Sequence, residues 1–204
     1  MKKACLIITG FLTLLIVISV IFAVFQKNVP MGDKVAVVRI EGPIMDSKNT
    51  TDEIKGYLKD ASIKAIVLRV DSPGGAVAPS QEIYEEVKKA TLKKKVIVSM
   101  GSVAASGGYY ISAPADRIIA NPGTLTGSIG VIMEIPNIEG LMNKIGVKTE
   151  VIKSGRHKDI ASAFRKMGKE ERLILQSVLD DVHEQFIKAV SDGRKIPFDE
   201  VKKL

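Results

Sequence analysis

The sequence predicts a layered α/β domain with a mainly parallel sheet, preceded by one transmembrane helix. Beyond residue 34, nearly continuous apolar runs alternate with amphipathic stretches of helical periodicity, as in parallel sheets covered by helices. Ahead of them, the 22 residues of 4–25 carry no charge and could cross about 30 Å of hydrocarbon as a helix. The remaining length, about 175 residues, suits one domain with its own core.

Hydrophobic patterning defines the expected elements in chain order. Short apolar runs predict buried strands, and apolar residues every three to four positions predict helices. The first half is expected to contain strands at 35–40, 65–70 and 95–100, and helices at 51–61, 79–89 and 102–112. The helix at 51–61 presents Ile54, Tyr57 and Leu58 on one face, and the helix at 79–89 presents Ile83, Tyr84 and Val87.

The second half is expected to begin with a strand at 117–120, which the breakers Asn121-Pro122-Gly123 end. It continues with strands at 129–133 and 148–152, a helix at 138–145 that ends at Gly146, and a long helix at 169–193. Apolar positions of the long helix are Leu173, Leu175, Val178, Val182, Phe186 and Val190. Internal repeats and a second domain are not expected, so residues 35–204 form the predicted domain.

The N-terminal region predicts a membrane anchor. Lys2 and Lys3 precede the apolar stretch, so the positive-inside rule places a tip of residues 1–3 in the cytoplasm. The domain would then be extracytoplasmic, joined to the cell membrane by a linker at 26–34. A cleaved signal peptide is the alternative, but the end of the apolar run lacks a small-x-small cleavage site. The sequence therefore favours an uncleaved, single-pass anchor in contact with membrane lipid.

Composition excludes several classes of function. The only cysteine, Cys5, lies in the apolar stretch, so disulfides cannot hold the domain together. The two histidines are isolated from each other and from carboxylate clusters, and no metal site is predicted. The sequence contains no phosphate-binding or dinucleotide-binding loop, so no cofactor is expected. The net charge of +7 is spread along the chain without an aromatic-interleaved basic patch, which argues against nucleic acid.

Ser106 and Lys158 are the residues that best indicate a chemistry. Ser106 lies among small residues, in Gly101-Ser-Val-Ala-Ala-Ser-Gly-Gly-Tyr-Tyr110, after a predicted buried strand. Such strand ends are where open α/β sheets bind ligands. A serine hydroxyl needs a base to take its proton, and a lysine can serve when burial or a neighbour keeps it neutral. Since the only histidines are His157 and His183, a serine–lysine dyad is the favoured prediction.

Glycine-rich loops add candidate donors to this site. Gly74, in Asp71-Ser-Pro-Gly-Gly75, and Gly107 could offer backbone N–H groups to an oxyanion. Ser128, in Thr126-Gly-Ser-Ile-Gly130, could orient a neutral lysine amine. Each motif also has a structural alternative, namely helix packing at Gly107, an ordinary turn at Gly74 and a turn serine at Ser128. Lys158 competes with other lysines nearby, and a base role for the adjacent His157 stays open.

Taken together, these motifs resemble the signal peptide peptidase A family (peptidase family S49), whose members are membrane-anchored serine proteases with a crotonase-like, Clp-protease-like fold. Three motifs carry the resemblance, together with Ser154-Gly-Arg-His-Lys-Asp159, which resembles the family's lysine motif. The resemblance implies that Ser106 is the nucleophile, Lys158 the general base and Ser128 a lysine-orienting residue. It also implies Gly74 and Gly107 as oxyanion donors.

The same resemblance implies a cofactor-free endopeptidase that degrades remnant signal peptides and other hydrophobic peptides, as a homo-oligomer whose neighbouring subunits help shape each site. Family members usually continue past the position of Leu204, so a C-terminally shortened domain is expected. Three alternatives stay open. The chain could be an inactive scaffold or interaction module, or a related protease with one specific membrane-protein substrate. The third alternative is an acyl-CoA enzyme of the crotonase fold, which would explain neither the lysine motif nor the anchor.

Overall fold

The structure is a computed structural model that describes residues 10–21 and 32–204. It divides into two units, Met1–Lys34 and Val35–Leu204, each of which is treated by itself. In the first unit, residues 10–21 are helical, and the rest of the expected anchor at 4–25 lies outside the described residues. The tip at 1–3 and most of the linker at 26–34 lie outside them too. Among the described helices, none combines the length and apolar character needed to span a membrane.

The second unit is built on a sheet in the order β1-β2-β3-β4, with β5 also paired to β3. The strands are β1 (Lys34–Glu41), β2 (Ile63–Ser72), β3 (Lys95–Ala105), β4 (Arg117–Ile119) and β5 (Leu125–Gly127). The pairings of β3 with β2, β4 and β5 are parallel, as predicted. One long central strand, β3, therefore meets β4 along its first half and β5 at its end.

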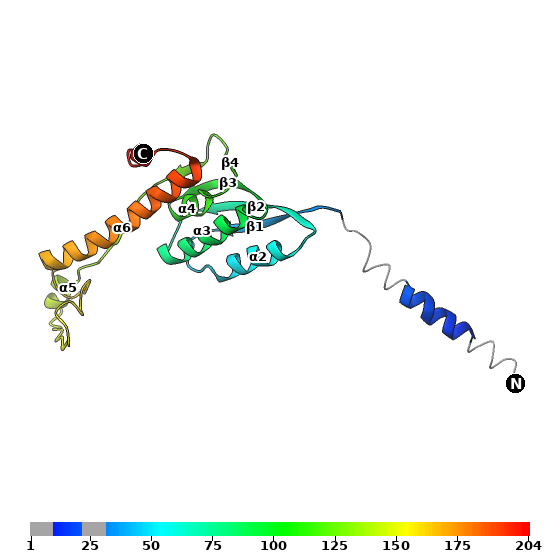
Figure 1. Ribbon diagram of the computed structural model, residues 1–204. Helices are drawn as coiled ribbons and strands as arrows, with labels where there is room; N and C mark the ends of the chain where they lie inside the picture. Colours follow the sequence, from blue (N-terminus) through cyan, green and yellow to red (C-terminus); the bar gives the residue numbers. More distant parts are fainter. Residues whose placement is uncertain (1–9, 22–31) are drawn as a thin grey trace, which may run out of the picture. The chain divides into compact units, whose positions relative to one another are not determined.

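The helices fall into two groups (Figure 1). α2 (Lys48–Lys59) and α3 (Val77–Thr91) lie against one face of the sheet, and the short α4 (Gly107–Ser112) follows β3 directly. The long α6 (Lys169–Arg194) extends away from the sheet, and α5 (Glu139–Lys144) lies near its distant end. The short α7 (Phe198–Val201) closes the described chain and was not expected from the sequence.

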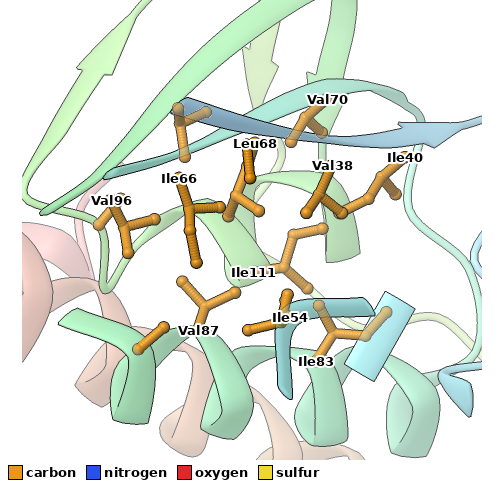
Figure 2. Packing of buried hydrophobic residues seen from close by; sticks show 14 of the residues in the cluster. Val38, Ile40, Ile54, Ile66, Leu68, Val70, Ile83, Val87, Val96 and Ile111 are labelled. Atoms are coloured by element: carbon orange, nitrogen blue, oxygen red, sulfur yellow. The ribbon is translucent and has the colours of Figure 1, made fainter. Parts of the chain in front are cut away.

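The core lies between the sheet and the helices α2 and α3 (Figure 2). Val38, Leu68 and Val98 are fully buried on the strands, and Ile83 and Val87 meet them from α3. The predicted inward faces of both helices are confirmed, since Tyr84 is buried too and Tyr57 and Leu58 pack against the cluster. Burying such side chains contributes about 1.5–3 kcal/mol each, which makes this half of the molecule a rigid base for the loops at the strand ends.

A second, smaller apolar cluster joins α4 to the C-terminal half of α6. The Tyr110 ring packs edge-on against Phe186, with centroids 5.0 Å apart, and Val190 is fully buried beside them. Arg194 donates to the carbonyl of Ala113 at 3.0 Å. These contacts hold only the C-terminal half of α6, because Leu173 and Val178, expected to be apolar contacts, are 70% and 50% exposed.

The structure corrects several expected elements. The strand 95–100 continues as β3 to Ala105, so the helix expected at 102–112 begins only at Gly107. Neither of the strands expected at 129–133 and 148–152 forms, although both runs are apolar. In a single chain these runs have no strand partner, and an apolar run without a neighbour to share its backbone hydrogen bonds does not become a strand.

Candidate active site

Ser106 occupies the junction between β3 and α4. Its backbone has φ 51° and ψ −122°, a left-handed conformation that is strained for a residue with a Cβ. Its N–H donates to the carbonyl of Gly127 at 2.9 Å, and its own carbonyl accepts the N–H of Tyr110 at 2.9 Å. Strain of this kind costs about 1–3 kcal/mol and persists where the surroundings enforce it, commonly at active sites.

An aspartate upstream of the glycine turn supports this junction. The Oδ1 of Asp71 accepts the N–H of Val103 at 3.0 Å. A Cβ on the facing Gly101 would lie 2.5 Å from Cγ of Asp71, so only glycine fits there. The register between β2 and β3 shifts at this point, between Val70 and Ser72. Neither role is evident from the sequence motifs, although both residues belong to them.

The glycine turn lies directly against Ser106. Gly74 has φ +94°, and a Cβ on it would lie 2.5 Å from the nitrogen of Gly107 and 2.9 Å from Cβ of Ser106. The N–H of Gly74, the predicted oxyanion donor, donates to Oγ of Ser72 at 3.1 Å. The neighbouring Gly75 instead lines the pocket beside Ser106, and its nitrogen lies 3.3 Å from where a Cβ of Gly107 would be.

Ser128 also lies at this junction. The parallel pairing of β5 with the end of β3 places Gly127 opposite Ala105, so Ser128 follows at the level of Ser106. Ser128 is exposed and has φ 53°, a second strained serine backbone at the same edge of the sheet. The structure therefore brings Ser106, Gly107, Gly74 and Ser128 to one place, although their motifs are spread over 55 residues (128 − 74 + 1).

A pocket of about 100 Å³ opens beside Ser106. Its walls come from the glycine turn, the start of α3, α4, the segment after Ser128 and α6. Apolar side chains make most of the lining: Val77, Tyr110, Val131, Ile132, Val182 and Phe186. Burial raises the pKa of the Tyr110 phenol to about 12, so this side chain stays neutral across the physiological range. The pocket suits a small or aliphatic side chain next to the serine.

Lys158 lies far from Ser106 within one chain. The adjacent His157 contacts Glu170, with Nε2 and Oε1 3.4 Å apart, near the start of α6. The serine pocket instead meets α6 at Val182 and Phe186. The rise of 1.5 Å per residue separates these two parts of α6 by about 18–24 Å, more than a lysine side chain spans. Lys158 is also exposed, whereas its predicted role as a general base requires burial to keep the amine neutral.

Charged residues fix the loop that carries Lys158. Arg165 donates from Nε to Asp159 Oδ2 at 2.7 Å and from Nη2 to Glu171 Oε1 at 2.5 Å. Lys153 donates to the second oxygen of Asp159 at 2.5 Å. Hydrogen bonds from Arg165, and then from the Gly168 N–H, lower the pKa of Glu171 to about 2. Arg165 and then Lys153 lower the pKa of Asp159. The loop is thus tied to the start of α6 rather than to the serine.

We expect replacement of Arg165 by methionine to loosen this loop. Since the pKa values of Asp159 and Glu171 are depressed in the folded chain, their ion pairs stabilise it above about pH 4 and are lost as the pH falls towards 2. In the parent, hydrogen exchange of residues 153–171, corrected for intrinsic rates, should stay slow down to about pH 4. In Arg165→Met it should be at least about tenfold faster at neutral pH.

The matched control is Lys188→Met, which removes an exposed ion pair with Asp192 from the same helix, where the two charged atoms are 3.3 Å apart. Its exchange in residues 153–171 should equal that of the parent. Unchanged exchange in Arg165→Met would show that the Arg165 ion pairs do not hold the loop.

The chain is similar in sequence to known proteases. Residues 88–204 match the sequence profile of Peptidase family S49, and residues 35–125 match that of Clp protease. A Synechocystis sp. protein provisionally named as a protease, slr0021, is 43% identical over 174 residues, covering 84% of this chain and 62% of that protein. Protease 4 of Haemophilus influenzae is 40% identical over 187 residues, covering 87% and 30%.

A protein of Enterococcus faecium, provisionally named signal peptide peptidase SppA, is 38% identical over 158 residues, covering 77% of this chain and 46% of that protein. The chain thus spans between about a third and just under two thirds of the length of these three relatives. The profile that matches more than half of the chain covers β3, the Ser106 junction, Ser128 and the Lys158 loop. The chain therefore belongs to peptidase family S49.

Proposed function

We propose that this chain is a serine endopeptidase in which Ser106 is the nucleophile and Lys158 the general base. The observation that carries the proposal is the strained backbone of Ser106 beside an apolar pocket and two glycine amides. Ser106 Oγ attacks the peptide carbonyl carbon while its proton moves to Nζ of Lys158. The lysine then protonates the leaving amine and activates the water that hydrolyses the acyl-enzyme.

Two backbone amides are the proposed donors to the oxyanion. Gly107 follows the nucleophile directly, and Gly75 lies across from it on the pocket wall. Around Gly75, Ile44 donates to the carbonyl of Gly74 at 2.9 Å and Ala76 donates to Ile44 at 2.8 Å. This pairing leaves the Gly75 N–H turned away from Ile44. We assign the second donor to Gly75, while Gly74, whose N–H is held by Ser72, shapes the turn.

The base of each site is proposed to come from a second copy of the chain. Within one chain Lys158 is exposed and about 20 Å along α6 from the pocket, so the dyad cannot close internally. Contact with another copy would bring a Lys158 to Ser106 and would also bury it, as a neutral amine requires. Ser128 is exposed next to Ser106, and we propose that it accepts a hydrogen bond from the arriving amine. The active form is thus proposed to be a homo-oligomer.

The proposed substrates are hydrophobic peptides, including remnant signal peptides. The pocket beside Ser106 is small and mostly apolar, which favours small or aliphatic side chains at the cleaved bond. A single-pass anchor at residues 4–25, with the domain on the extracytoplasmic side, would hold the site close to such peptides at the membrane. The test is cleavage of a quenched, alanine- and leucine-rich peptide by the full-length chain, with Ser106→Ala as the inactive reference.

Replacing Gly74 by alanine should disrupt the site. The new Cβ would lie 2.5 Å from the backbone nitrogen of Gly107, at a φ of +94° that disfavours any side chain. Because the clash pushes Ser106 and Gly107 out of line, kcat/KM for the quenched peptide should fall at least about 10²-fold. The control is Gly56→Ala in α2, where a Cβ meets nothing within 4 Å. Parental activity in Gly74→Ala would contradict the proposed arrangement.

A further inference from the structure

A second cavity of about 570 Å³ lies beside the N-terminal half of α6. One wall is α6 itself, where Leu175 and Leu179 are half-buried. The other walls are the segment 133–137 and the loop 162–168 that precedes α6. Two of these elements also line the serine pocket, through Val182 on α6 and Val131 on the segment. We call the serine pocket and this second cavity, which follow one another along α6, the α6 groove.

Helical spacing aligns the two cavities of the α6 groove along one face of α6. Leu175, Leu179, Val182 and Phe186 follow one another at intervals of three and four residues, so they share one face of α6. The opposite wall is fastened at both ends. His183 Nε2 lies 3.2 Å from the Ile129 carbonyl, and Ile138 donates to Ala163 at 2.8 Å. The segment is therefore held to α6 at one end and to the loop before α6 at the other.

The wall between these two fastenings offers backbone groups for pairing. Residues 130–137 form neither helix nor strand. Within the described chain, none of their backbone N–H or C=O groups forms a hydrogen bond with another backbone group. An extended peptide can pair with such an edge by strand addition, with its side chains alternating into the groove. An extended, apolar peptide therefore fits this groove better than a compact ligand.

The far end of the α6 groove is cationic. The lining of the second cavity includes Arg165, Lys166, Lys169 and Arg172 and no carboxylate. Arg165 is already paired with Asp159 and Glu171. For the other three, no acidic partner occurs within 4.0 Å in the part of the chain that the structure describes. An anionic group on the peptide would complete this end.

We propose that the α6 groove binds the peptide substrate in extended form and that its cationic end binds a carboxylate of that peptide. Lys169 and Arg172 lie 13 and 10 residues before Val182 on α6, about 15–20 Å along the axis. An extended chain covers this distance in about five or six residues. The carboxylate is therefore about five or six residues from the bond that Ser106 attacks. This inference rests on the proposed function and adds a substrate class to it.

A second copy of the chain is the main competing occupant. The groove face is turned to the segment 130–137, whereas Leu173 and Ile174 lie on other faces of α6 and are 70% and 39% exposed. Subunit contacts thus have a separate apolar surface. Alignment with the serine pocket on one face of α6 and the unpaired cations favour a peptide in the groove itself.

The test measures binding of fluorescent, alanine- and leucine-rich 14-residue peptides to the full-length Ser106→Ala chain in a non-ionic detergent. Two pairs carry Asp or Asn six residues from the central bond, one pair on the N-terminal side of that bond and the other on its C-terminal side. A third pair ends in a free carboxylate or an amide, which separates a terminal from a side-chain carboxylate. The charged peptide should bind about three- to tenfold more tightly, and the difference should shrink in about 0.5 M salt.

Variants locate the effect. Lys169→Gln/Arg172→Gln, added to Ser106→Ala, should remove the preference, so that the charged and uncharged peptides bind with equal affinity. The matched control Lys59→Gln/Lys93→Gln removes two lysines outside the groove and should keep the preference. Equal affinity of the Ser106→Ala chain for charged and uncharged peptides would overturn the proposal.

Two other outcomes would also overturn it. A lower molar mass of the Lys169→Gln/Arg172→Gln assembly would identify the groove as a subunit contact. If the Lys169→Gln/Arg172→Gln chain lost its binding to phosphatidylglycerol vesicles but kept the preference for the charged peptide, the cations would be assigned to lipid. Binding is measured without cleavage, so the two proposals can fail separately. If the parent cleaved none of the peptides but the Ser106→Ala chain still preferred the charged one, only the proposed function would be refuted.

Discussion

Replacement of Ser106 by alanine is expected to lower kcat for peptide cleavage by at least about 10⁴-fold. The expectation follows from the role of Oγ, because no acyl-enzyme can form without it. Residual cleavage would come only from peptide binding and the oxyanion donors Gly75 and Gly107. The fold should survive, since Ser106 is only half-buried and alanine removes an oxygen without adding volume.

The measurement is the rate of quenched-peptide cleavage by the parent and Ser106→Ala chains at equal concentration. The control is Ser102→Ala, because Ser102 stands exposed on the same strand, β3, and carries no proposed role. A fluorophosphonate probe should label Ser106 in the parent and leave Ser106→Ala unlabelled. Cleavage by Ser106→Ala at the parental rate would end the proposal that this serine is the nucleophile.

Co-assembly of Ser106→Ala with Lys158→Ala is expected to restore activity that neither variant has alone. In a site made from two chains, an intact Ser106 from one variant can meet an intact Lys158 from the other. Random 1:1 assembly should make about a quarter of the sites complete, so activity should reach about a quarter of the parental value. A dyad contained in one chain predicts no recovery.

The experiment co-expresses the two full-length variants at equal levels and purifies all assemblies through one affinity tag that both variants carry. A second mixture, of parent with the Ser106→Ala/Lys158→Ala chain, provides the control. Sites shared between chains predict about a quarter of the parental activity here, whereas sites within one chain predict about half. Recovery absent from the first mixture, together with half activity in the second, would place both residues of the dyad in the same chain.

The inner part of the fold could be predicted because its signals are local. The strands β1 and β2 and the helix α3 follow from apolar runs and helical periodicity, which depend on nearest neighbours along the chain. The same rule failed at 129–133 and 148–152, where the composition suits a strand but the single chain supplies no partner. It also placed a helix at 102–112, because it could not detect that β5 pairs with the end of β3 and extends it.

The site was predictable in part for the same reason. Small residues around Ser106 and the glycines after Pro73 mark turns at strand ends, and parallel strands bring such ends together. Patterns cannot choose between Gly74 and Gly75 as an amide donor, because that choice depends on which N–H Ser72 accepts. Nor could they show that Asp71 and Gly101 fit together, which depends on the register between β2 and β3.

The class of fold and the peptidase family follow from the sequence, because turn residues and hydrophobic periods depend on neighbours along the chain, and the serine–lysine dyad stays a prediction. The separation of Ser106 and Lys158 within one chain is evident only from the three-dimensional arrangement. That separation is set by α6, a rigid helix of 26 residues anchored to α4 at Phe186 and tied to the Lys158 loop near Glu171. Because a helix keeps its rise per residue along its whole length, its two ends cannot approach each other.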